Sequence, residues 1–82
     1  MQSTVHKRSI LINGRKTSVS LEDAFWQGLR EVADLNNESV AMLASRIDRT
    51  RALNNLSSAI RVFVLDHYRS RVMQAQPARE AA

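Results

Sequence analysis

The first third of the chain alternates between apolar and polar positions with a period of two. Two short runs within residues 7–21 alternate with polar neighbours at every second position, at Ile10, Ile12, Thr17, Val19 and Leu21. This period is typical of half-buried strands. Asn13-Gly14 separates the two runs, and this dipeptide tolerates the positive φ angles of a type I′ turn. The pattern therefore predicts two strands joined by a tight turn.

The next segment changes to the apolar spacing of a helix. Apolar side chains follow one another at steps of four, four and three, at Leu21, Phe25, Leu29 and Val32. These steps place them on one face of a helix, which we expect to end near Asn36-Asn37. The run Ser20-Leu21-Glu22-Asp23 resembles a capping box, in which a serine hydroxyl accepts hydrogen bonds from free amides and acidic side chains interact favourably with the helix dipole.

Two further helices are predicted in the second half of the chain. The first is short, starts at Glu38 or Ser39, and has an apolar face formed by Val40, Leu43, Ala44 and Ile47. After a polar connection over residues 51–55, the second has a wide apolar surface formed by Leu56, Ala59, Ile60, Phe63, Val64, Leu65 and Val72. A helix that is apolar on more than one side must be covered on more than one side, which in a short chain favours a second protomer.

Length and composition predict a single small domain. The 82 residues provide one core at most, and we expect a flexible N-terminus over residues 1–6, a folded domain over 7–73 and a disordered tail over 74–82. Small domains without disulfides or metals often dimerise to complete their core. The chain has no cysteine, which excludes disulfides and thiolate zinc sites. It lacks an apolar run of membrane-spanning length and a signal-peptide pattern, so we expect a cytoplasmic protein with no membrane association.

The positive charge is concentrated at the start of the chain. Residues 1–21 contain no acid and four basic side chains, Lys7, Arg8, Arg15 and Lys16. The remainder contains eight basic and eight acidic side chains, so the whole net charge of +4 comes from the first segment. A basic segment on a neutral body indicates a surface that binds a polyanion.

The sequence offers no recognisable set of catalytic groups. Only His6 and His67 could titrate near neutral pH, and neither has a nucleophile or a spaced carboxylate beside it. A Gly-rich phosphate loop is excluded because Gly14 and Gly28 are the only glycines. We therefore expect a protein that is not an enzyme and has no metal or cofactor, and we interpret His67 as a residue of a helix surface or an interface.

The second predicted strand presents a polar face opposite its apolar one. Because successive side chains of a strand alternate between faces, Lys16, Ser18 and Ser20 share the side opposite Val19. A two-stranded ribbon fits the DNA major groove, where a lysine can donate to guanine and a serine can pair with several base edges. The alternative is that these residues only form the solvated face of an antiparallel sheet.

Two motifs in these segments resemble the ribbon-helix-helix family of bacterial repressors. The likeness covers roughly residues 7–71 and includes the run from Lys16 to Trp26 and the polar turn before Ser39-Val40. A short subgroup of the family shares Arg15-Lys16-Thr17-Ser18-Val19-Ser20-Leu21-Glu22 and Asn55-Leu56-Ser57-Ser58-Ala59-Ile60-Arg61-Val62-Phe63-Val64-Leu65-Asp66-His67-Tyr68. The second motif is the more specific of the two.

The resemblance implies a mainly α fold with a short N-terminal β-ribbon, ribbon-helix-helix-like with an additional helix, in an intertwined homodimer. Each protomer would donate one strand to a ribbon that enters the major groove of double-stranded DNA, with base contacts from Lys16, Ser18 and Ser20. Contacts to the DNA backbone are expected from Lys7, Arg8, Arg15, Ser39, Ser57, Ser58 and Arg61. The dimer core is expected to contain Val19, Leu21, Phe25, Leu29, Ile60, Phe63 and Val64.

Several alternatives stay open at the level of sequence. The helix N-terminus that binds phosphate could be at Ser39, which chain distance from the ribbon favours, or at Ser57, which resembles the family's usual start of the second helix. Glu38 would repel a phosphate at Ser39, and Arg61 would attract one at Ser57. Residues 7–12 could form a hairpin strand or an arm along flanking DNA. The function predicted from the resemblance is sequence-specific DNA binding by a transcriptional repressor. One alternative is a protein-interaction module with little DNA specificity, an antitoxin-like or adaptor dimer that binds a partner through the third helix or the tail. The other is non-specific architectural DNA binding.

Overall fold

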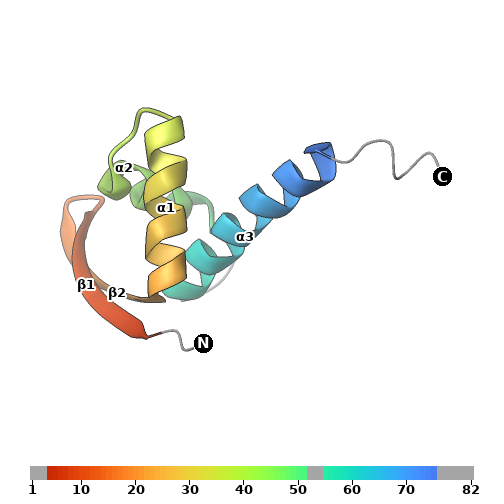
Figure 1. Cartoon of the computed structure of the whole chain (residues 1–82). Coiled ribbons are helices and arrows are strands. Elements are labelled where there is room, and N and C mark those ends of the chain that lie inside the picture. Colours follow the sequence, from red (N-terminus) through yellow and green to blue (C-terminus); the bar gives the residue numbers. More distant parts are fainter. Residues whose placement is uncertain (1–3, 52–54, 76–82) are drawn as a thin grey trace.

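A two-stranded hairpin packs against three helices (Figure 1). The computed structural model describes residues 4–51 and 55–75. The hairpin consists of β1 (Val5–Ile12) and β2 (Arg15–Glu22), and the helices are α1 (Asp23–Leu35), α2 (Val40–Thr50) and α3 (Leu56–Ala75). The second half of α3 projects from the rest of the molecule (Figure 1). The predicted architecture, mainly helical with an N-terminal ribbon and one helix more than the minimal ribbon-helix-helix pattern, is confirmed.

Residues 7–12 form a hairpin strand. β1 and β2 pair antiparallel from Ile12 opposite Arg15 to Val5 opposite Glu22. The turn residues have positive φ angles, 51° at Asn13 and 84° at Gly14, as a type I′ turn requires. The strand begins at Val5 and so includes the last two residues of the N-terminal segment that the sequence predicts to be flexible. At the other end of the chain, most of the predicted tail, residues 76–82, lies outside the described residues.

The hairpin is fixed to the helices at both of its ends. At the turn, the backbone N–H of Asn13 donates to Ser45 Oγ (3.1 Å), its Nδ2 donates to Asp48 Oδ2 (3.1 Å), and Arg49 Nη1 donates to its Oδ1 (2.9 Å). All three partners belong to α2. At the open end, the indole Nε1 of Trp26 in α1 donates to the carbonyl oxygen of His6 (3.0 Å). The ribbon is therefore held in place by α1 and α2.

The predicted capping box at the start of α1 is wrong. Ser20 and Leu21 are residues of β2, the helix begins at Asp23, and the N-cap residue Glu22 makes no side-chain capping hydrogen bond. Pairing with β1 keeps this segment extended as far as Glu22, and the backbone N–H of Asp23 donates to the carbonyl of Thr4 (3.1 Å). The strand thus continues through the position at which the sequence pattern begins a helix.

The predicted end of α1 and the predicted start of α2 are confirmed. Asn37 has a positive φ of 57°, its N–H donates to Asp34 O (3.1 Å), and the N–H of Glu38 donates to Ala33 O (2.8 Å). These two bonds form a Schellman motif. Ser39 then caps α2, because its Oγ accepts from the N–H of Met42 (3.0 Å). Of the four residues predicted for the apolar face of α2, Leu43, Ala44 and Ile47 are buried, and Val40 is half-buried against the core.

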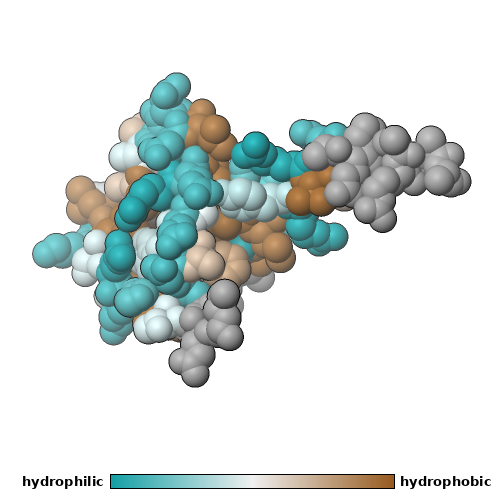
Figure 2. All heavy atoms as spheres, in the orientation of Figure 1, coloured by the Kyte–Doolittle hydropathy of each residue, from teal (hydrophilic) through white to brown (hydrophobic). Residues whose placement is uncertain are grey.

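The core lies between the inner face of the hairpin and the three helices. Its fully enclosed side chains come from every layer, namely Val19, Leu21, Leu29, Val32, Leu43 and Ile60. α3 contributes Ala59, Ile60 and Val64 to this core, but it leaves other apolar side chains exposed, including Val62, Leu65, Val72 and Met73. Figure 2 shows apolar surface along α3. The wide apolar surface predicted for this helix is therefore only partly covered within one chain.

A close contact between α1 and α3 depends on Gly28. A Cβ atom at this position would lie 2.8 Å from Val64 Cγ1 and 3.4 Å from Tyr68 Cε2. We expect Gly28→Ala to lower the free energy of unfolding by about 0.5–2 kcal/mol, because overpacking costs about 1–3 kcal/mol and the better helix propensity of alanine offsets up to about 1 kcal/mol. Thermal unfolding measures the change, with Arg30→Ala on the exposed side of α1 as control. Equal stability of Gly28→Ala and the original chain would contradict a close helix contact.

Candidate nucleic-acid interface

The outer face of the hairpin combines polar side chains from both strands. The register places Lys7 opposite Ser20, Ser9 opposite Ser18, and Leu11 opposite Lys16. Directly opposed residues of an antiparallel pair point to the same side of the sheet. All six side chains are exposed except that of Ser20, which is half-buried. The structure thus brings together the three predicted base-contacting residues and adds Lys7, Ser9 and Leu11 to the same face.

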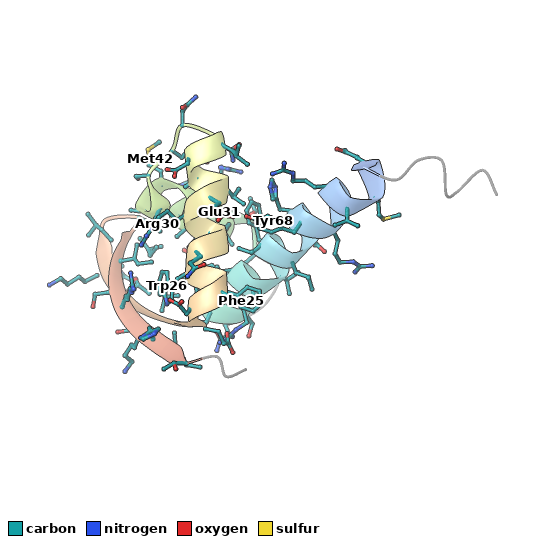
Figure 3. All side chains as sticks on the ribbon, viewed as in Figure 1. Phe25, Trp26, Arg30, Glu31, Met42 and Tyr68 are labelled. Carbon is teal, nitrogen blue, oxygen red and sulfur yellow. The ribbon has the colours of Figure 1, made fainter. Side chains whose placement is uncertain are left out.

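The other two basic residues of the hairpin belong to its opposite side. Arg8 is paired with the buried Val19, and Arg15 with the buried Ile12. The guanidinium carbon of Arg8 lies 5.1 Å from the centroid of the Trp26 ring, within the range of a cation–π contact. Trp26 itself is buried on the side of α1 that faces the hairpin (Figure 3). The four basic residues that the sequence groups together are therefore divided between two faces.

The start of α3 is bonded to the free edge of β2. The backbone N–H of Ser20 donates to Ser57 Oγ (3.0 Å), and Arg61 Nη2 donates to the carbonyl of Ser20 (3.1 Å). Arg61 Nε also donates to Glu22 Oε1 (2.8 Å). Ser57 and Arg61, both predicted to contact the DNA backbone, thus make hydrogen bonds within the chain at the border of the outer face. The sequence contains no local signal for the ion pair of Arg61 with Glu22, because 39 positions separate the two residues.

The ion pair of Arg61 with Glu22 stabilises the folded chain to an extent that depends on pH. The hydrogen bond from Arg61, followed by a backbone hydrogen bond, holds the pKa of Glu22 below its ordinary value of 4.5. Since the folded-state pKa is the lower one, the stabilisation is complete above the unfolded-state pKa and disappears as the pH falls through the folded-state pKa. We expect Glu22→Gln to remove the part of the folding stability that is lost when Glu22 is protonated. Melting temperatures between pH 7 and pH 3 test it, with Asp34→Asn as control, and an unchanged pH profile of Glu22→Gln would contradict the assignment.

Both candidate helix starts for phosphate binding have internal partners. At α2, Ser39 Oγ caps its own helix, and Glu38 Oε1 lies 2.7 Å from Arg46 Nη2. The hydrogen bond from Arg46 lowers the pKa of Glu38, so this acid remains charged and paired. At α3, the N–H of Ser58 donates to Asn55 Oδ1 (3.1 Å). The acid beside Ser39 is paired with an arginine, and the start of α3 is hydrogen-bonded to the ribbon through Ser57 and Ser20.

The residues predicted for a dimer core divide into two groups. Five of them are buried within one chain, namely Val19, Leu21, Leu29, Ile60 and Val64. Phe25 and Phe63 are only half-buried. Phe63 borders an open groove of about 420 Å³ between α2 and α3, together with Ile47, Ala59 and Val62. The aromatic side chains are therefore the members of the set that a single chain leaves incompletely covered.

Tyr68 and His67 are neighbouring aromatic residues of α3. Tyr68 donates a hydrogen bond to the Glu31 carboxylate, and Figure 3 shows these side chains pointing toward one another between α3 and α1. This bond raises the pKa of Tyr68. His67 packs edge-on against the Tyr68 ring with centroids 5.0 Å apart, and its buried Nε2 has no hydrogen-bond partner within the described residues. Within residues 4–51 and 55–75, no three histidine or acidic side chains are grouped to hold a metal ion, and no helix is both long and apolar enough to span a membrane.

The chain is similar to one known domain family and to a solved structure. A family model described as a ribbon-helix-helix domain matches residues 5–68. The solved structure of an uncharacterized protein from Bordetella pertussis Tohama I matches with a TM-score of 0.67 and 35% sequence identity, over 90% of this chain. The chain spans 61% of the length of that protein. No protein of curated function matches the sequence.

Proposed function

Because the chain belongs to the ribbon-helix-helix family, whose members typically bind DNA, we propose that it is a homodimeric, sequence-specific transcriptional repressor. The start of α3 further suggests the short subgroup with the Asn-Leu-Ser-Ser-Ala-Ile-Arg motif. The repressor occupies a pseudo-palindromic operator in double-stranded DNA and blocks transcription by that occupancy.

The outer face of the hairpin is the observation that carries this proposal. Lys16 and Ser18 are exposed there, with Ser20 at the border, on a ribbon that is fixed at both ends. Lysine donates to the acceptor atoms of guanine, and serine hydroxyls pair with several base edges, so these residues supply specificity. Phosphate contacts supply most of the affinity. The start of α3, which is hydrogen-bonded to the free edge of β2, borders the outer face there.

The homodimer is proposed from the apolar surface that one chain leaves open. Phe63 is half-buried beside the groove between α2 and α3, and Val62, which lines the same groove, is 47% exposed. A contiguous exposed apolar patch on a small domain marks an interaction surface. A second copy that packs along α3 would cover these side chains and would place two hairpins on one operator.

Fluorescence anisotropy tests the proposal. The protein is titrated into a labelled duplex from the region upstream of its own gene and into a scrambled duplex, at two salt concentrations. We expect tighter binding to the first duplex, and an affinity that falls steeply as salt rises, because phosphate contacts release counterions. Equal binding to both duplexes would indicate architectural binding, and binding to neither would contradict the proposal.

A second candidate function is a protein-interaction module. The observation in its favour is the projecting half of α3, where Val72 is 56% exposed and Met73 is 61% exposed. An apolar stripe on a free helix can dock into the groove of a partner protein. Co-purification of a partner that is lost in Val72→Asp, together with no binding to either duplex, would favour this function over repression.

A further inference from the structure

The hairpin turn and α2 form an open hollow beside the outer face of the hairpin. This α2 hollow has a volume of about 420 Å³, and its lining includes Leu11 and Gly14 of the hairpin and Met42 and Arg49 of α2. Figure 3 shows Met42 on α2, above the turn of the hairpin. Leu11 is directly opposite Lys16, so it belongs to the outer face as well as to the α2 hollow. The hollow is therefore continuous with the surface that the proposed function assigns to DNA.

One side of α2 supplies positive charge to the hollow. Arg46 and Arg49 follow Met42 at steps of four and three, so the three side chains share one side of the helix. Arg46 is paired with Glu38, the acidic residue of the lining. Arg49 is exposed, and its Nη1 donates to Asn13 Oδ1 (2.9 Å). Within residues 4–51 and 55–75, its Nε and Nη2 have no partner, so Arg49 carries the charge that is not compensated in the hollow.

The position of α2 beside the hairpin decides which part of DNA this charge meets. α2 contacts β1 and the turn, whereas the start of α3 is bonded to β2, so each strand has a helix beside it. The major groove is about 12 Å wide and is bounded on both sides by the phosphates of the DNA backbone. When the outer face lies in this groove, a group beside the face meets phosphates, and only a group on the face meets base edges.

We infer that α2, the helix that the minimal ribbon-helix-helix pattern lacks, is part of the DNA interface and that Arg49 binds a backbone phosphate at the α2 hollow. This inference rests on the proposed function. The two free donors, Nε and Nη2, form the planar fork with which a guanidinium binds two oxygens of one phosphate. The hydrogen bond from Nη1 to Asn13 holds that fork in place beside the turn. The contact is additional to those expected from the ribbon and the start of α3.

The salt dependence of DNA binding tests the contact. An operator is first selected from a random-sequence pool with the original chain, and Arg49→Ala is then compared with the original chain on the operator and on a scrambled duplex. We expect Arg49→Ala to bind both duplexes more weakly by the same factor, because a phosphate contact contains no sequence information. This factor should be about 3.5-fold smaller at about 200 mM than at 50 mM salt, since the loss of one phosphate contact lowers the salt slope by about 0.9. Arg69→Ala on the projecting half of α3 removes the same charge and should leave the slope unchanged.

Two further measurements separate a DNA contact from support of the turn, because Arg49→Ala also removes the hydrogen bond to Asn13. Phosphates of the operator are replaced one at a time by neutral methylphosphonates. At one position in each half-site the replacement should weaken binding of the original chain and leave Arg49→Ala unaffected, whereas a change in the turn alone would leave every position equally sensitive in both proteins. Glu38→Gln removes the negative charge of the lining and should bind both duplexes more tightly.

The outcomes distinguish this inference from the proposed function. If the original chain enriches no sequence, the proposed function fails, and the inference fails with it. If the original chain enriches a motif, and Arg49→Ala has the same salt slope and the same methylphosphonate profile, the inference alone is overturned. Loss of preference at one base pair in Arg49→Ala would make Arg49 a base contact and would also overturn it.

Discussion

Phe63→Ala is expected to lower the free energy of unfolding of the homodimer by about 3–5 kcal/mol per protomer, the cost typical of removing a buried phenylalanine. Within one chain Phe63 is half-buried beside the groove between α2 and α3. The full cost therefore requires that a second copy covers the remaining surface. Sedimentation and chemical unfolding over a range of protein concentrations would measure the loss, because the stability of a dimer depends on protomer concentration.

The matched control is Met42→Ala on α2. Met42 is 59% exposed and lies outside the groove, so its replacement should change stability by less than about 0.5 kcal/mol. If Phe63→Ala remains dimeric and is as stable as the original chain, Phe63 is not in the dimer core. A loss of stability that does not depend on protein concentration would assign Phe63 to the core of one chain only.

Lys16→Ala is expected to weaken binding to the selected operator by about 1–3 kcal/mol, which corresponds to an affinity about 5- to 150-fold lower. The reason is the loss of a charged donor from the outer face of the hairpin, where Lys16 is exposed opposite Leu11. The same variant should bind a scrambled duplex almost as well as the original chain does. Anisotropy titrations on both duplexes at one salt concentration measure the two affinities.

Arg69→Ala serves again as the control for charge, since it removes one positive charge from the projecting half of α3. An equal loss on both duplexes would make Lys16 a phosphate contact and would contradict its role in specificity. Unchanged affinity on both duplexes would exclude the outer face around Lys16 from the interface.

Much of the fold could be predicted from the sequence, because local signals and tertiary packing agree. The Asn13-Gly14 turn has the φ angles that its sequence favours. α1 ends where Asn37 predicts, and α2 begins where Ser39 predicts. The sequence pattern places the start of α1 too early, because Ser20 fits a capping box as well as a strand. Pairing with β1 decides between the two, and a capping pattern contains no information about that pairing.

The candidate site was predicted only in part. The alternation that places Ile10 and Ile12 inward also places Lys7 and Ser9 outward and Arg8 inward, so this signal was present in the sequence. The sequence contains no signal for the attachment of the hairpin turn to α2, because the hydrogen bonds of Asn13 span 32 to 36 positions of the chain. The hydrogen bonds that Arg61 donates to Ser20 and Glu22 are equally long-range. Contacts of this kind depend on how the helices pack and leave no periodic pattern.

The attachment of the hairpin at both ends bears on the kinetics of DNA recognition. A recognition element that orders only on contact with its ligand loses conformational entropy at that moment, and this lowers its affinity. Here Asn13 is bonded to α2 and the carbonyl of His6 to Trp26, so the backbone of the ribbon has already lost that freedom in the unbound protein. Encounter with the operator therefore includes no folding step for the ribbon. The association rate is then governed by diffusion, orientation and charge steering, and differences in affinity between operators lie mainly in the dissociation rate.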